Sequence, residues 1–153
     1  MKTHETNISQ KNTSMTKILI DSDVIIDLFL DREPFVDQSE RIFEELAAGH
    51  VHGYVTASAL LNIYYIVRKT LGRSMALDCL RRLFETDGLE ILAIEKRHVQ
   101  TALDSGMSDF EDAVQAVAAQ FAGIDMIVTR NIRDFQNAPV PALTPEELLQ
   151  KIV

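Results

Sequence analysis

The segment that decides the fold lies near the N-terminus, where residues 17–29 read KILIDSDVIIDLF. The run KILID is short, apolar and ends in an acid, which predicts a buried parallel strand with a polar residue at its carboxyl end. Burying the Asp21 carboxylate there is costly unless a metal ion or a hydrogen-bond donor compensates for it. Asp23 and Asp27 follow, on a turn and on the helix expected to begin there. Asp21, Ser22 or Asp23 could also simply cap that helix, because short polar side chains favour N-cap positions.

Strands and helices alternate through the rest of the chain. The hydrophobic spacing predicts helices at residues 36–50, 57–71, 74–86, 95–105 and 108–123. A last helix is opened by Thr144, Pro145 and Glu147. Further strands are expected at residues 53–56, 89–92 and 125–129. This alternation predicts an α/β fold with three layers, α/β/α, around a mostly parallel central sheet.

Length and composition predict one domain. With 153 residues, 46% of them hydrophobic, the chain has material for a single core. We expect residues 1–14 to be a disordered tail without the apolar stretch of an export signal, and residues 15–153 to be the domain. Met15 could also mark the natural start. No apolar stretch reaches the roughly 20 residues that a membrane helix needs, and the single Cys79 fits a protein of the reducing cytoplasm.

The net charge restricts how the chain could act on nucleic acid. A formal net charge of -8 argues against a broad electrostatic grip, because phosphate binding normally rests on many lysine and arginine contacts. Any chemistry on nucleic acid is therefore expected to be local and metal-assisted. The same charge favours a cationic protein partner.

Acidic residues gather at the start of the helix expected at 108–123, which begins SDFEDA. Ser108 and Glu111 fit a capping box, and Asp109 fits an acid that stabilises the helix dipole. Asp112 has neither explanation. Its i, i+3 spacing from Asp109 places two like charges side by side, where they repel unless a cation lies between them.

A further polar group follows the strand expected at 125–129, in the loop TRNIRDF. Asn131 could hold a metal-bound water, whereas Asp134 is interpreted as a turn residue. On the helix at 57–71, Asn62 lies among apolar neighbours and needs a partner if it is buried. Ligands gather outside the carboxyl ends of parallel strands, and Mg²⁺ or Mn²⁺ prefers oxygen ligands such as these.

The first of these stretches resembles a motif of the PIN domain family. The segment ILIDSDVIIDLF looks like the family's hhhDxNxhhD, with Asp21 in the place of the leading metal-binding aspartate. Asp23 stands where the family usually has Asn. The similarity extends over residues 17–150.

Two later stretches carry the same resemblance. FEDAVQAVAA is similar to the family's D-A-x-x-A-A helix, which puts Asp112 on the third acidic position with Asp109 as a nearby helper. VTRNIRDF resembles the last motif, with Thr129 as its hydroxyl and Asn131 where many members carry Asp or Asn. Three motifs in the expected order are more specific than any one alone.

The resemblance implies a Mg²⁺ or Mn²⁺ dependent ribonuclease, of a kind that is often a toxin. RNA as substrate, an antitoxin-like protein as partner and a homodimer are expected with it. The predicted catalytic residues are Asp21, Asp112, Asp109 and Asn131. Asp21 and Asp112 would ligate the metal, and the supporting residues would be Asp23, Asn62, Thr129 and Glu111. The predicted RNA contacts are Arg68, Lys69 and Arg130.

The chain departs from the family at one position, and this keeps alternatives open. The family's glutamate on the helix after the second strand would fall at Asn62, which carries no charge and cannot act as a base. A catalytically weak PIN module that binds RNA or a protein is therefore one alternative. A phosphatase of the haloacid dehalogenase type, with Asp21 of IDSDVI as nucleophile, is another, although a downstream acid pair is missing. His50 and His52 form a possible metal pair without a third ligand nearby.

Overall fold

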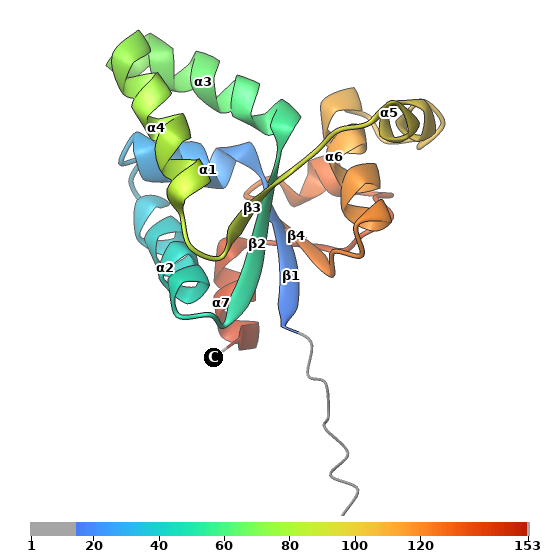
Figure 1. Ribbon diagram of the computed structural model, residues 1–153. Helices are drawn as coiled ribbons and strands as arrows, with labels where there is room; N and C mark the ends of the chain where they lie inside the picture. The colour runs from blue at the N-terminus through green and yellow to red at the C-terminus, as the bar shows by residue number, and fades with distance from the viewer. Residues whose placement is uncertain (1–14, 153) are drawn as a thin grey trace, which may run out of the picture.

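The computed structural model describes residues 15–152, so the expectations for residues 1–14 and for Val153 lie outside the described part. A five-stranded sheet forms the centre, in the order β3-β2-β1-β4-β5 (Figure 1). All four strand pairs are parallel. The strands are β1 (Thr16–Ile20), β2 (Val51–Thr56), β3 (Leu89–Leu92), β4 (Met126–Val128) and β5 (Ala142–Leu143).

Seven α-helices and one 3-10 turn connect the described strands. The helices are α1 (Ser22–Phe29), α2 (Val36–Ala47), α3 (Ala57–Leu71), α4 (Arg73–Glu85), α5 (Lys96–Ala102), α6 (Phe110–Phe121) and α7 (Pro145–Ile152). The 3-10 turn η1 (Ile132–Phe135) follows β4. No helix in residues 15–152 combines the length and apolar character that crossing a membrane requires.

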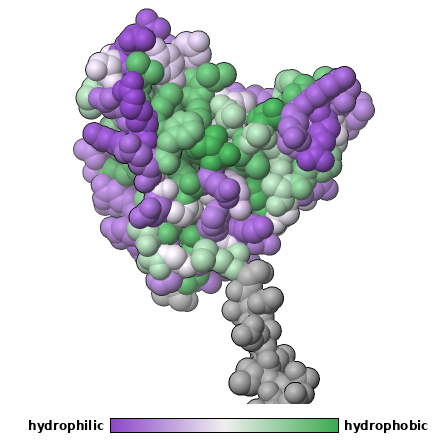
Figure 2. Space-filling model, viewed as in Figure 1, coloured by the Kyte–Doolittle hydropathy of each residue, from purple (hydrophilic) through white to green (hydrophobic). Residues whose placement is uncertain are grey.

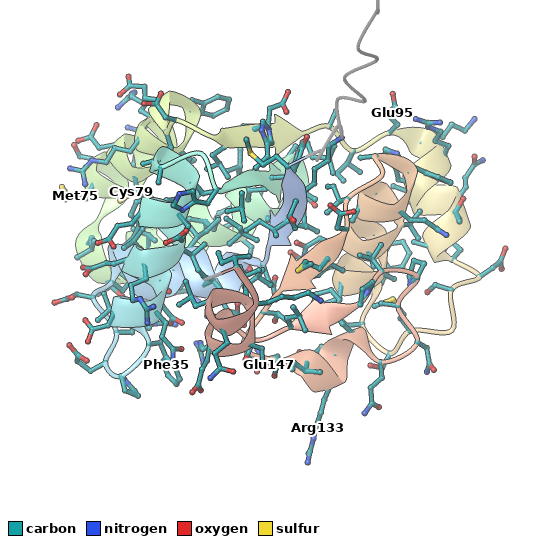
Figure 3. All side chains as sticks on the ribbon, turned by 90° about the horizontal axis from the view of Figure 1, so that it is seen from below. Phe35, Met75, Cys79, Glu95, Arg133 and Glu147 are labelled. Atoms are coloured by element: carbon teal, nitrogen blue, oxygen red, sulfur yellow. The ribbon has the colours of Figure 1, made fainter. Side chains whose placement is uncertain are left out.

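Alternation of side chains along β1 assigns helices to the two faces of the sheet. Ile18 and Ile20 pack with buried residues of α1, α2, α3, α4 and α7, whereas Leu19 packs with α6 and the segment after β4. The predicted α/β/α arrangement is therefore confirmed, with a sheet that is parallel throughout. Cys79, labelled in Figure 3, is buried in the first of these cores.

Several predicted element ends were wrong because local signals competed. The helix expected at 95–105 is α5, which ends at Ala102, and the helix expected to be capped by Ser74 begins at Arg73 with Gly72 before it. The strand β5 has only two residues, too few for a periodic pattern to reveal it. The last helix begins as predicted: Thr144 Oγ1 accepts from the Glu147 amide at 3.2 Å.

Candidate functional site

Sheet order places two distant polar residues side by side. Ile20 of β1 pairs with Val128 of β4, so the residues that follow them, Asp21 and Thr129, leave the sheet together. The Thr129 hydroxyl donates to Asp21 Oδ2 at 2.8 Å, across 108 positions of sequence. In the sheet, β2 lies on one side of the β1–β4 pair and β5 lies on the other, so the chain leaves β1 and β4 toward opposite edges. This makes the end of the β1–β4 pair a topological switch point, where ligands bind in parallel sheets.

Asp21 occupies the N-cap position of α1 and is nearly buried, with 7% of its surface exposed. Its carboxylate accepts from the Ser22 amide at 2.8 Å and from the Gln115 side-chain amide at 3.4 Å, besides Thr129. Burial raises the pKa of Asp21 above its usual range, and these three hydrogen bonds oppose that rise. Gln115, from the middle of α6, was not among the predicted residues, and nothing in a single sequence marks it.

Asp23 holds the loop after β4 instead of capping α1. Its Oδ2 accepts from the Arg130 amide at 3.1 Å and from the Asn131 side-chain amide at 3.2 Å. Its Oδ1 is buried and has no hydrogen-bond partner. Burial and then the charge of Asp21 raise the pKa of Asp23 to about 7. An orphaned carboxylate oxygen of this kind favours a cation or water beside it.

The start of α6 brings two more acids to the site. The predicted Ser108 and Glu111 capping box was wrong, because Asp109 is the N-cap and accepts from the Asp112 amide at 2.9 Å. Burial, followed by the charges of Asp21 and Asp109, raises the pKa of Asp112 to about 8. Asp112 and Asp21 therefore lie within electrostatic reach of one another, although 91 positions separate them.

Asp134 belongs to the same cluster and was interpreted from sequence as a turn residue. It lies in the first turn of η1, and its charge helps raise the pKa of both Asp21 and Asp112. Its sequence signal was present: it is an acid in the loop that follows a strand, the same rule that selected Asp21. Turn propensity outweighed that signal because Asp is common in loops.

Asn62 reaches the same region from α3. Its side-chain amide donates to Ser22 Oγ at 2.9 Å, beside Asp21. The supporting role predicted for Asn62 thus gains a defined contact, and the partner that its half-buried amide needed is Ser22.

The predicted RNA contacts fall into two groups. Arg68 and Lys69 are exposed in the last turn of α3. The Arg130 guanidinium instead pairs with Asp27, at 2.6 and 3.1 Å. His50 pairs with Glu45 and His52 pairs with Glu90, so the two histidines share no partner.

The donor set fits a hydrated Mg²⁺ or Mn²⁺ better than a closed metal cage. Within residues 15–152, no three His, Cys, Asp or Glu side chains group closely enough to hold a metal ion by themselves. A hard cation needs only one or two carboxylates, since it keeps several waters. Asp21, Asp112, whose pKa the charge of Asp21 raises, and the orphaned Asp23 oxygen fit that requirement.

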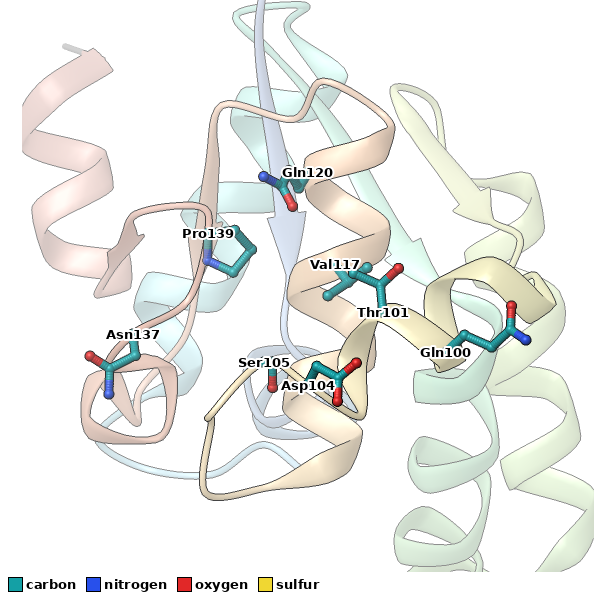
Figure 4. Close-up of a pocket in the computed structure, with 8 residues that line it drawn as sticks. All are labelled: Gln100, Thr101, Asp104, Ser105, Val117, Gln120, Asn137 and Pro139. Carbon is teal, nitrogen blue, oxygen red and sulfur yellow. The ribbon is translucent and has the colours of Figure 1, made fainter.

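The acidic site lies outside the groove that the structure shows beside α5 and α6. A groove of about 480 Å³ lies between α5, α6 and the segment after η1 (Figure 4). Its lining is mainly amides and hydroxyls, with Asp104 as the single acid, and it contains none of the predicted site residues. Figure 2 shows the molecule hollowed between α3 and α5, on the side where the strands have their carboxyl ends. The acids define the site, because the binding of a hard cation depends on the type of ligand atom and not on the volume of a groove.

The raised pKa values predict how the stability of the metal-free protein depends on pH. Asp23 and Asp112 titrate near 7 and 8 in the folded state and near 3.8 when unfolded, so the folded state binds more protons between these values. The free energy of unfolding should therefore fall as pH rises from about 4 to about 8. Urea unfolding in chelator at several pH values measures this, and Asp112→Asn should flatten the decline. A free energy of unfolding that rises with pH across this range would contradict the description of the site as a group of crowded acids.

Comparison with known proteins shows which family this chain is similar to. A protein-family model described as "PIN domain" matches residues 17–133. Ribonuclease VapC1 of Aquifex aeolicus (strain VF5) is 26% identical over 140 residues, which cover 88% of this chain and 94% of that protein.

Solved structures share the fold at low sequence identity. VapBC2 from Rickettsia felis, bound to a DNA fragment from its promoter, matches with a TM-score of 0.67 and 16% identity over 84% of this chain and 98% of that one. DNA-bound VapBC from Salmonella typhimurium matches with a TM-score of 0.63 and 18% identity, over 86% of this chain and 99% of that one. The sarcin-ricin loop cleaving toxin VapC20 of Mycobacterium tuberculosis matches with a TM-score of 0.59 and 13% identity, over 72% of this chain and 86% of that one. These likenesses concern the fold alone.

Proposed function

This chain belongs to the PIN domain family, and we propose that it is a ribonuclease that hydrolyses RNA phosphodiester bonds with Mg²⁺ or Mn²⁺ held by Asp21 and Asp112. The observation that carries the proposal is the gathering of acids at the carboxyl edge of the sheet, where buried Asp21 lies beside Thr129 and the charges of Asp21, Asp109 and Asp134 raise the pKa of Asp112. Like charges held together are unfavourable without a cation, so the arrangement suits metal binding. The relationship to a ribonuclease of Aquifex aeolicus points to RNA as the substrate class.

The chain's own residues would prepare this chemistry. A bound divalent cation supplies Lewis acidity and offsets the negative charge of the phosphodiester. Thr129 and the Ser22 amide fix the orientation of the Asp21 carboxylate. Asp112, with a pKa of about 8 without metal, would lose its proton on ligating the cation. Asn131 is exposed and is oriented by the hydrogen bond that its side-chain amide donates to Asp23.

A cleavage assay with a defined cation tests the proposal. Purified protein and a structured RNA should give discrete cleavage products with Mg²⁺ or Mn²⁺ and none with EDTA, and Asp21→Asn should be inactive. Loss of phosphate from a phosphomonoester without RNA cleavage would instead favour the phosphatase alternative, which the family match leaves without support. RNA binding without turnover would favour the weak PIN module.

One observation favours that second candidate, the catalytically weak PIN module. Asn62, which donates to Ser22 Oγ, provides no negative charge to the site. One fewer anionic ligand weakens the binding of a hard cation. The module and the nuclease differ in turnover, so the same assay separates them.

We propose an antitoxin-like partner and a homodimer. VapBC complexes are among the structures that share this fold, and the net charge of -8 favours a cationic partner. An apolar groove between α1, α2, α3 and α4 has a volume of about 370 Å³ and includes Phe29, Phe43 and Met75. Leu61 and Tyr65, one turn apart on α3, are exposed apolar side chains available to a second copy. A cytoplasmic location stays a prediction that rests on Cys79.

Co-expression tests these partners. A small basic protein encoded beside this chain should co-purify with it and inhibit cleavage, and light scattering should give a dimer mass. A monomer that the neighbouring protein neither binds nor inhibits would exclude both.

A further inference from the structure

Asp27 is a buried carboxylate that the proposed metal site does not use. It lies one turn beyond Asp23 on α1, and its side chain has 0% exposure. Two arginines approach it. Arg130 Nε and Nη2 donate to its two oxygens at 2.6 and 3.1 Å, whereas Arg32 Nη1 lies 3.8 Å away and is more exposed. Arg130 is thus the principal partner of this carboxylate.

Arg130 belongs to the segment that carries the site's later residues. It directly follows Thr129, which donates to Asp21, and it precedes Asn131 and Asp134. Its backbone amide donates to Asp23 Oδ2 at 3.1 Å. The segment after β4 is therefore tied to α1 twice through one residue, by a main-chain bond to Asp23 and a side-chain fork to Asp27.

A third contact restricts the guanidinium further. The Phe35 ring, at the start of α2, lies with its centroid 4.0 Å from Arg130 Cζ. A bidentate contact with a carboxylate demands the planar fork of arginine, which can at the same time stack on an aromatic ring, and the point-charge ammonium of lysine cannot reproduce that combination. The residue is held in one orientation by α1 on one side and by the start of α2 on another.

Stability alone does not account for this arrangement. A buried ion pair often contributes little net stability, because desolvation of the charges offsets their attraction. What the fork supplies is geometry, since it fixes a loop residue against a helix whose N-terminus carries Asp21 and Asp23. We propose that Arg130 is a positioning residue, whose fork to Asp27 holds the segment 129–134 so that Asn131 stays beside Asp23 and Asp134 stays near Asp21 and Asp112. This deepens the proposed nuclease function and rests on it.

The test compares Arg130→Lys with two matched controls. Arg32→Lys alters the other arginine at the same carboxylate, and Arg133→Lys alters an arginine of the same segment that extends away from the protein (Figure 3). Three quantities are measured for each variant: hydrogen exchange of the amides of residues 130–135, Mn²⁺ affinity by electron paramagnetic resonance, and kcat and KM for RNA.

Arg130→Lys should retain the fold and the charge of the pair but loosen the segment. We expect faster exchange at residues 130–135, weaker Mn²⁺ binding, and a kcat lower by about 10²-fold with little change in KM, as for a small misplacement of reacting groups. Neither control should change exchange in this segment or Mn²⁺ affinity.

Two results would overturn the positioning role. In the first, hydrogen exchange at residues 130–135 is the same in Arg130→Lys as in the wild-type protein. In the second, hydrogen exchange in Arg130→Lys increases equally in α1, α2 and this segment, as expected if the ion pair is purely structural. If the wild-type protein itself fails to cleave RNA, the nuclease proposal fails, whereas exchange and Mn²⁺ binding still decide the role of Arg130.

Discussion

Replacement of Asp112 by asparagine is expected to lower metal-dependent RNA cleavage by about 10³-fold, which corresponds to the several kcal/mol of charge stabilisation that a correctly held cation provides. The same change should leave the free energy of unfolding of the metal-free protein unchanged or raise it. Burial and the charges of Asp21, Asp109, Asp134 and Glu111 all disfavour the ionised Asp112 side chain, so a neutral amide of the same shape removes repulsion. Residues that serve function commonly cost stability in this way.

The measurements are initial cleavage rates at saturating Mn²⁺ and urea unfolding in the presence of chelator. Asp78→Asn is the matched control, because it removes the same charge from an exposed position on α4. It should leave cleavage intact. An Asp112→Asn protein that loses substantial stability yet cleaves RNA at the wild-type rate would show that Asp112 is structural.

Asn62→Glu is expected to increase Mn²⁺ or Mg²⁺ affinity by about 10-fold or more and to raise the cleavage rate with it, because an added anionic oxygen favours a hard cation. The Asn62 side chain already reaches Ser22, next to Asp21, so a carboxylate at this position would lie beside the site. The metal-free variant should be less stable. It loses the hydrogen bond to Ser22 and crowds a further negative charge near Asp21.

Asn62→Gln separates charge from length, since glutamine has the size of glutamate and no charge. Calorimetric Mn²⁺ titration and cleavage kinetics of both variants give the comparison. Only the glutamate should tighten metal binding. If the two variants bind Mn²⁺ alike and cleave at the wild-type rate, the second family motif does not function at this position, and the weak-module alternative loses its basis.

The fold was largely predictable because its signals are local. The stretches KILID and DMIVT contain the buried residues of β1 and β4, and each helix carries apolar residues at its own period. The rule for acids at strand ends selected Asp21 and the family resemblance singled out Thr129, and the structure places their side-chain oxygens 2.8 Å apart. Their convergence follows from the adjacency of β1 and β4, which residue spacing alone does not reveal.

Contacts that decide the electrostatics of the site were less accessible. Ser108 and Asp109 are both good caps, and their sequence does not say which one bonds the Asp112 amide. Asp134 reads equally well as a turn residue. Arg130 was predicted only as an RNA contact, and its partner in the structure, Asp27, lies 103 positions earlier, where no local pattern reveals it.

The sequence by itself determined the α/β class, the family and the group of acids from which a site could be made, because period, capping and motif are properties of neighbouring residues. Only the tertiary structure decided which acids repel one another, which oxygen of Asp23 remains without a partner, and that Arg130 closes on Asp27. Burial and charge coupling depend on distances between segments, and those distances are set when the strands take the order β3-β2-β1-β4-β5. A pKa of about 8 for Asp112 is therefore a property of the assembled sheet and helices, and no local stretch of the chain contains it.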